Sequence, residues 1–200
     1  MAPSAAGLDR FHQAQEGVHG PGSAEALREI RAGRKRSHWI WYVLPQLAGL
    51  GHSAMAQRYG IADCAEAQAY LADPVLGPRL AEITDAIARQ LQAGVTLEAL
   101  LGALDARKTV SSLTLFVRAA QDSSGPWIPP FLEQANAVLD HAASQGIPRC
   151  SLTRARLGQN AQRQTLTSSA AEIQQRHDLL VRNAHLLGHQ QQQGPRAAPS

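Results

Sequence analysis

The chain has 200 residues, with 19 Lys and Arg against 16 Asp and Glu and a formal charge of +3. This length fits one domain of ordinary size with additional residues. Because no apolar run reaches the roughly 18 residues of a membrane span and the first residues lack a secretion signal, we expect a soluble, cytoplasmic protein. Two distant cysteines, Cys64 and Cys150, indicate reduced thiols and not a disulfide framework or a zinc site.

Two helices are predicted in the N-terminal part. Residues 8–16 have apolar side chains at helical spacing, and the Gly and Pro residues at 19–22 end that segment. A second helix is predicted over 24–32, with Ser23 as its N-cap and Gly33 at its C-terminal end.

The segment 37–44 is ambiguous. Its aromatic and β-branched residues suit a buried strand, while Ser37 as a cap and Pro45 as a stop suit a short helix. No second convincing strand exists to pair with it, and a lone strand leaves its backbone groups unsatisfied. We therefore expect helix or irregular structure here.

Capping signals mark the next two helices. Ser53 is placed to cap a helix over 54–59. Asp63 and Glu66 form the capping-box pattern before another helix, which Pro74 ends.

Residues 78–92 form the clearest amphipathic helix, starting at Pro78. Thr96 is placed to cap a short helix with four leucines, and apolar periodicity predicts a further helix over 109–120.

A Pro-, Gly- and Ser-rich stretch at 122–130 is predicted as a surface loop pinned by Trp127. Apolar spacing then predicts another helix around 131–139. We therefore expect an all-α fold, a compact single-domain multi-helix bundle with irregular connections.

The domain is predicted to span 8–158 and to be followed by a Gln-rich, low-complexity tail over 159–200. Such a composition buries too little apolar area to offset its ordering entropy, so we expect a largely disordered tail. One periodic stretch predicts a helix at 170–188 that either docks on the domain or binds a partner.

Short motifs of known chemistry are absent, including the P-loop, G-x-G-x-x-G, H-E-x-x-H and G-x-S-x-G. His185 and His189 have the spacing of half a metal site, but nothing nearby supplies the other ligands. We therefore expect no metal and no cofactor.

The densest group of polar and aromatic residues is GRKRSHWIWYVLPQ at 33–46. One interpretation is that its aromatic side chains are core and its cations a solvated turn. The other is that the cations form an anion site, with His38 as a proton donor or acceptor near neutral pH. The residues alone leave both open.

Three blocks of the sequence resemble, in order, a bacterial and fungal family known as domain of unknown function 1810. They are GRKRSHWIWYVLPQLAGLGHSAMAQRYGI at 33–61, AYLADPVLGPRL at 69–80 and DARKTVSSLTLF at 105–116. The resemblance covers about 8–158. It implies a compact all-helical domain of no established activity.

The polar positions that match the family blocks come from three separate segments. They are Lys35, Arg36, Ser37, His38, Trp41, Gln46, Ser53, Gln57, Tyr59, Lys108, Ser111 and Ser112. If the fold brings the segments together, cations, hydroxyls and amides would line a pocket suited to a phosphate-bearing ligand. This sequence departs from the family at Thr109, where members usually carry Leu, in the longer 122–130 loop and in the missing aromatic pair near 141–146.

The best hypothesis is therefore a binding or catalytic pocket for a small anionic ligand. His38 would be its acid or base, and the other eleven residues would contact the ligand. Whether the protein is an enzyme, and its oligomeric state, are left open. An alternative is a non-enzymatic module for protein or nucleic acid, suggested by the basic run at 28–36. Only five cations cluster there, so we rank nucleic acid below a small ligand.

Overall fold

In the computed structural model, residues 7–18, 20–158 and 174 are described. The chain divides into two units, Met1–Leu157 and Gly158–Ser200, and the labelled helices all belong to the first. The helix predicted at 170–188 lies outside the described residues, apart from residue 174.

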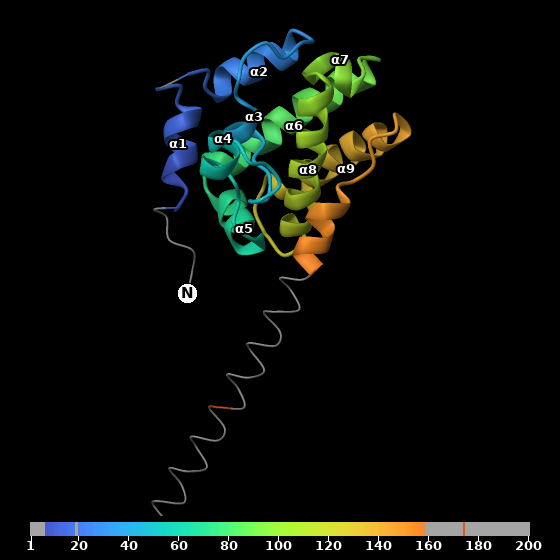
Figure 1. Ribbon diagram of the computed structural model, residues 1–200. Coiled ribbons are helices and arrows are strands. Elements are labelled where there is room, and N and C mark those ends of the chain that lie inside the picture. Colours follow the sequence, from blue (N-terminus) through green and yellow to red (C-terminus); the bar gives the residue numbers. More distant parts are fainter. Residues whose placement is uncertain (1–6, 19, 159–173, 175–200) are drawn as a thin grey trace, which may run out of the picture. The chain divides into compact units, whose positions relative to one another are not determined.

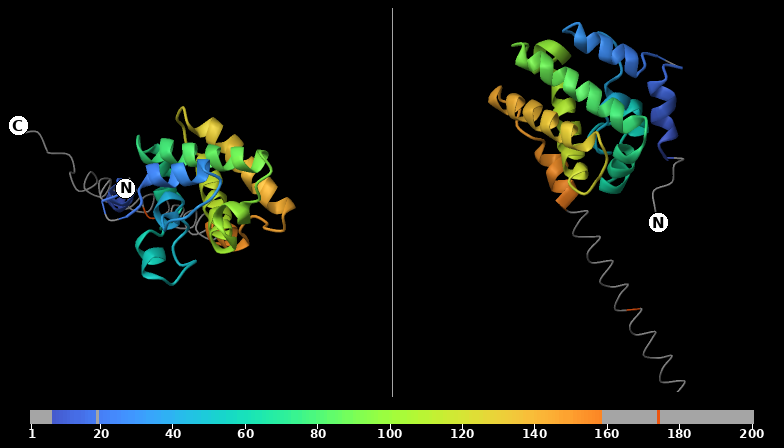
Figure 2. Two further views of the ribbon diagram at one scale, coloured as in Figure 1. Left: turned by 90° about the horizontal axis from the view of Figure 1, so that it is seen from above. Right: turned by 180° about the vertical axis from the view of Figure 1, so that it is seen from behind.

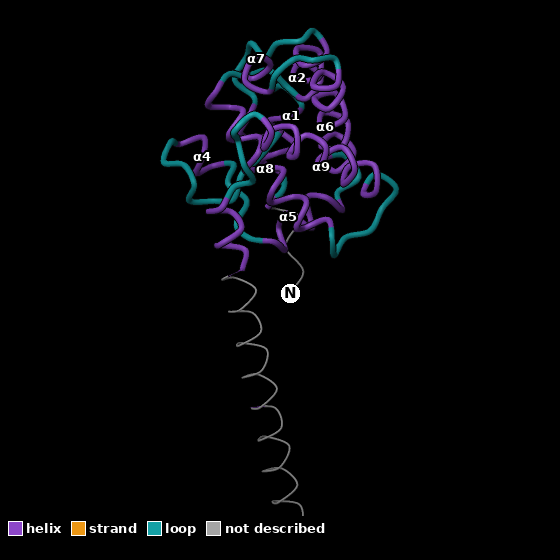
Figure 3. Tube along the Cα trace, turned by 90° about the vertical axis from the view of Figure 1, so that its right-hand side faces the viewer, coloured by secondary structure: helices purple, strands orange, loops and turns teal. Residues whose placement is uncertain are grey.

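The described part of the first unit is all-α, which confirms the predicted fold class (Figures 1 and 3). Figure 3 shows helices joined by loops, and the β-type pairing within the described residues is an isolated parallel bridge between Leu47 and Ile61. Residues 151–158 are helical as well. The labelled helices are α1 (Asp9–Gln15), α2 (Ser23–Arg31), α3 (Ile40–Val43), α4 (Ala54–Arg58), α5 (Cys64–Ala72), α6 (Leu76–Gln92), α7 (Leu97–Leu101), α8 (Ala103–Ala120) and α9 (Ile128–Ser144).

Helix α8 is the centre of the fold. Most of its residues are buried, and it packs against α5, α7 and α9 and touches α3. Behind it, α2, α6 and α9 lie side by side, as the right-hand view of Figure 2 shows. The 33–61 region meets the first turns of α8, and this junction holds the polar residues of the candidate site.

Local capping explains several helix starts. The side chains of Ser53, Asp63 and Thr96 each accept a hydrogen bond from the backbone N–H three residues on, as predicted. Two other predicted caps are wrong. Ser23 is already the first residue of α2, and Ser37 donates its hydroxyl to Glu29 instead of capping α3.

The ambiguous 37–44 segment contains a short helix, α3, as expected from the lack of a partner strand. The loop predicted at 122–130 ends sooner, because Ile128 begins α9 and two prolines fit its first turn, where backbone N–H groups have no intrahelical acceptor. Trp127 does hold this loop, since its indole nitrogen donates to the carbonyl oxygen of Leu71 at 2.7 Å.

Two helices begin earlier than their apolar patterns indicate. Helix α6 starts at Leu76, so Pro78 stands within its first turn. Helix α8 starts at Ala103, six residues before the predicted 109. The apolar pattern did not reveal these first two turns, because they carry the polar residues Asp105 and Lys108.

Candidate functional site

The turn between α2 and α3 is built around the carboxylate of Glu29. Gly33, with φ of +80°, reverses the chain after α2. The carboxylate then accepts hydrogen bonds from the backbone N–H groups of Arg36 and Ser37, the hydroxyl of Ser37 and the indole N–H of Trp39, at 2.5–3.1 Å.

These four bonds explain how a carboxylate that is only 6% exposed stays charged. Burial opposes ionisation, but the hydrogen bonds from Arg36, Ser37 and Trp39 outweigh it and lower the pKa of Glu29 to about 2. The turn is therefore held by an ionised side chain from the preceding helix.

A second carboxylate, which is partly buried, joins this turn to α8. Asp105 Oδ2 lies 2.7 Å from Lys35 Nζ, and Asp105 Oδ1 lies 2.8 Å from Lys108 Nζ. Burial opposes the charge on Asp105, but the bonds from Lys108 and Lys35 outweigh it, so the pKa of this carboxyl is lowered.

Each lysine also lies over an aromatic ring. Lys35 Nζ is 5.1 Å from the centre of the Trp39 ring, and Lys108 Nζ is 4.5 Å from that of Trp41. The Lys35 side chain is 7% exposed and also donates to the Ser37 carbonyl, whereas Lys108 is more open at 19%. Lys35 is thus committed to internal contacts, and Lys108 faces a hollow.

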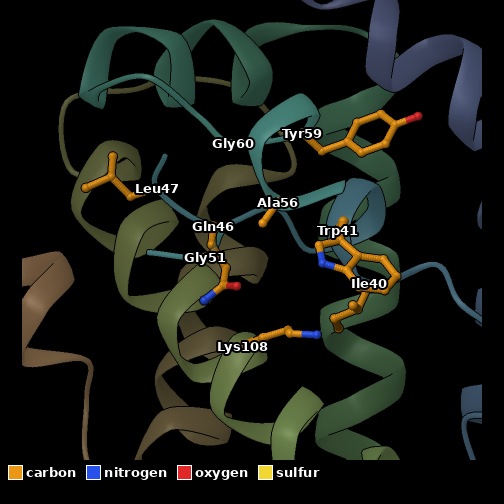
Figure 4. Close-up of a pocket in the computed structure, with 9 residues that line it drawn as sticks. All are labelled: Ile40, Trp41, Gln46, Leu47, Gly51, Ala56, Tyr59, Gly60 and Lys108. Carbon is orange, nitrogen blue, oxygen red and sulfur yellow. The ribbon is translucent and has the colours of Figure 1, made fainter. Parts of the chain in front are cut away.

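That hollow is small and open to solvent, with a cavity volume of about 10 Å³ (Figure 4). Gln46, Trp41 and Lys108 surround the open space, while the side chains of Leu47 and Tyr59 point away from it. The residues that line it are Ile40, Trp41, Gln46, Leu47, Gly51, Ala56, Tyr59, Gly60 and Lys108.

Two polar groups at the hollow lack partners. Within the described part of the chain, neither the indole N–H of Trp41 nor the side-chain amide of Gln46 makes a hydrogen bond. Trp39 and Trp127, by contrast, both donate their indole N–H groups, to Glu29 and to the Leu71 carbonyl. A half-buried indole N–H normally finds an acceptor, so the hollow offers unused hydrogen-bonding capacity.

The structure brings four of the twelve sequence-predicted residues to the hollow: Trp41, Gln46, Tyr59 and Lys108. Lys35 lies behind them, bonded to Asp105. The three segments from which the predicted residues come do meet at the hollow, although only these four of the twelve residues line it.

The side chains of the turn lie elsewhere. Arg36 and His38 are exposed and do not line the hollow, and Ser37 is bonded to Glu29. In the described structure the imidazole of His38 has no partner. Its acid–base role therefore stays a prediction.

The remaining predicted residues have local or internal contacts. Ser53 caps α4, and Gln57 donates to the His52 carbonyl on the surface at 3.3 Å. Ser111 is buried and its hydroxyl lies 3.0 Å from that of Thr153, while the buried hydroxyl of Ser112 has no partner in the described residues. None of these four lines the hollow.

Two residues that organise the site were not predicted from the sequence. Glu29 lies in the middle of a cation-rich helix, where it looks like one half of a surface ion pair. Asp105 precedes Lys108 by three positions, the spacing of a helical ion pair, which could have marked it as Lys108's partner. Its second partner, Lys35, is seventy positions away.

The described residues contain neither a group of side chains that could hold a metal ion nor a helix that could cross a membrane. There, no three His, Cys, Asp or Glu side chains lie close enough together to hold a metal ion. No helix among the described residues is both long and apolar enough to cross a membrane.

Comparison with known proteins gives two matches. The family model described as "Protein of unknown function (DUF1810)" matches residues 5–138. The crystal structure of the conserved hypothetical protein Rv1873 from Mycobacterium tuberculosis is similar at a TM-score of 0.60 and 40% identity, over 76% of this chain and 96% of that one. No curated protein matches.

Proposed function

Since the chain belongs to the DUF1810 family of proteins of unknown function, we propose a function from the site itself: the hollow between Trp41, Gln46 and Lys108 binds a small anionic, phosphate-bearing ligand. The observation that carries the proposal is the convergence on one space of Trp41 and Gln46, from the segment after α2, with Lys108 of α8; the polar groups of Trp41 and Gln46 have no internal partner in the described residues. Anionic oxygens are the acceptors that such a set of donors recognises best.

The local charge favours an anion. Lys35 and Lys108 share the single carboxylate of Asp105, which leaves one positive charge in excess at the hollow. The ammonium group of Lys108 donates one hydrogen bond to Asp105, which leaves two N–H groups that can donate to a ligand. The indole of Trp41, held under Lys108, adds a flat apolar wall beside the anion.

The proposal is one of binding. The exposed imidazole of His38 does not line the hollow, so we give it no part in ligand binding. The hollow itself has a volume of only about 10 Å³, roughly the room of one water molecule, so it suits a single phosphate group placed at its mouth and not a bulky molecule.

The three tryptophans allow a direct test by NMR of their indole N–H groups during titration with inorganic phosphate and pyrophosphate. We expect a saturable shift of the Trp41 signal. The signals of Trp39 and Trp127 should stay in place, because their N–H groups are already bonded inside the protein.

Lys108→Met should abolish the Trp41 shift while the protein stays folded, because Asp105 keeps its bond to Lys35. Arg107→Met, which removes the neighbouring exposed cation on α8, is the matched control and should leave the titration unchanged. The proposal is refuted if the Trp41 signal does not shift with either anion, or if it shifts to the same extent in Lys108→Met as in the wild type. Shifts caused by single-stranded RNA at 34–36 alone would favour the interaction-module alternative.

A further inference from the structure

We propose that Arg156 is a positioning residue for the hollow: it holds the loop 46–51, which forms one wall, and so sets how tightly the anion binds. Arg156 belongs to the helical residues 151–158, which follow the stretch 5–138 that the family model matches. The effect on anion affinity rests on the proposed function, whereas the hold on the loop is measurable in the protein without ligand.

The loop 46–51 has few backbone anchors. The Ile61 N–H donates to the Gln46 carbonyl at 2.9 Å, and the Ala48 N–H donates to the Ile61 carbonyl at 2.7 Å. Within the described part of the chain, residues 47–51 make no other backbone hydrogen bond. The loop supplies the Gln46 side chain to the hollow (Figure 4), so its position depends on further contacts.

Arg156 supplies the second anchor. Its Nη1 donates to the Ala48 carbonyl oxygen at 2.7 Å, and no other side chain among the described residues forms a hydrogen bond with 47–51. The guanidinium lies against Gly49, where a Cβ would be 2.6 Å from Nη1. Gly49 also has φ of +78°, so both the turn and the close approach of Arg156 require glycine. Ala48 is thus held through its N–H by Ile61 and through its carbonyl by Arg156.

The helical residues that carry Arg156 are seated on α8, the helix that brings Lys108 to the hollow. Thr153 is fully buried, and its hydroxyl lies 3.0 Å from that of Ser111, which follows Lys108 by less than one turn. Arg156 comes three positions after Thr153 and therefore projects from the same side of the helix. The loop 46–51 and Lys108 share α8 as their support, which gives the sequence-predicted Ser111 an indirect part in the site.

Hydrogen exchange in the protein without ligand tests the hold on the loop. Arg156→Ala should speed exchange of the Ala48 amide about tenfold, the effect of losing one hydrogen bond from a charged donor. Amides of α8 should keep their wild-type rates, because Arg156 is exposed and its loss leaves the core intact. Arg156→Lys keeps a charged donor and should restore most of the protection. Arg154→Ala removes an exposed arginine of the same helix that has no side-chain partner in the described residues, and should change nothing.

A titration with pyrophosphate, followed through the indole N–H signal of Trp41, tests the effect on the hollow. Arg156→Ala should weaken binding about fivefold, because Gln46 is then in place for a smaller fraction of the time. Arg156→Lys should bind nearly as tightly as the wild type. Arg154→Ala should bind with the wild-type affinity, which separates the anchor from the loss of one positive charge.

The proposal is overturned if Arg156→Ala leaves the exchange of the Ala48 amide unchanged, or if Arg154→Ala speeds it as much. It is also overturned if Arg156→Ala binds pyrophosphate as tightly as the wild type does. A wild type that binds no pyrophosphate would refute the proposed function instead, and the exchange rates alone would then decide whether Arg156 holds the loop.

Discussion

The indole N–H of Trp39 donates a 2.8 Å hydrogen bond to the carboxylate of Glu29, so a fully buried tryptophan is tied to a buried anion ten residues earlier. The same carboxylate holds the backbone of Arg36 and Ser37. The cation-rich turn is thus fixed from inside by a negative charge, and its exposed arginines are free to face solvent. The buried Trp39 fits the interpretation of this segment as core and turn, whereas Trp41 faces the hollow.

Glu29→Gln should destabilise the protein by about 3 kcal/mol. Glutamine keeps the size of the side chain, but its NH₂ group cannot accept the hydrogen bonds that the turn donates, so buried donors are left unpaired. Urea unfolding followed by tryptophan fluorescence measures the change. Glu25→Gln, on the same helix but paired only with Arg28 at the surface, should leave the unfolding midpoint almost unchanged. Equal losses in the two variants would contradict the role given to Glu29.

The same carboxylate should make stability depend on acid pH. The folded-state pKa of Glu29 is about 2, below the ordinary value of 4.5, so ionised Glu29 favours the folded state above pH 4.5. This contribution, about 3 kcal/mol, should decline as pH falls from 4.5 towards 2. Asp105 and Asp73, whose pKa values are also lowered, act in the same direction. The stability difference between wild type and Glu29→Gln isolates the Glu29 part, and a difference that does not change over this pH range would exclude it.

Gly77→Ala should cost about 2 to 4 kcal/mol. A Cβ at this position would lie 2.5 Å from the indole nitrogen of Trp127 and closer still to the carbonyl oxygen of Leu71. It would therefore push apart the hydrogen bond that holds the 122–127 loop on α5. Thermal unfolding tests this. Gly20→Ala is the control, because its Cβ would meet only the Tyr42 hydroxyl at 3.9 Å, and a similar loss there would show that Gly77 is not specially crowded.

Thr109→Val should stabilise the protein by about 1 kcal/mol. The Thr109 side chain is fully buried and its hydroxyl has no partner in the described residues, so a valine of the same shape removes a desolvated group. Ser111→Ala, two positions on, should instead destabilise, because it breaks the hydroxyl contact with Thr153. Denaturation midpoints of the two variants give the comparison. A destabilised Thr109→Val would mean that the hydroxyl does have a partner.

The sequence by itself determined the fold class and most of the helix starts. Ser53, Asp63 and Thr96 cap helices because a cap involves a side chain and a backbone N–H only three residues apart, and both are readable in one stretch of sequence. Apolar spacing likewise located α6, although the helix starts two residues before the predicted Pro78. The first two turns of α8 were missed, because polar residues interrupt the apolar pattern there.

Only the tertiary structure decided which polar side chains act together. Lys35 and Lys108 were both predicted ligand contacts, yet one is buried against Asp105 and the other faces a hollow. The pairing of Lys35 with Asp105 joins residues seventy positions apart, and it depends on how the turn after α2 packs on α8. A single sequence records which residues can form such a pair, but the partner that each finds is set by helix packing.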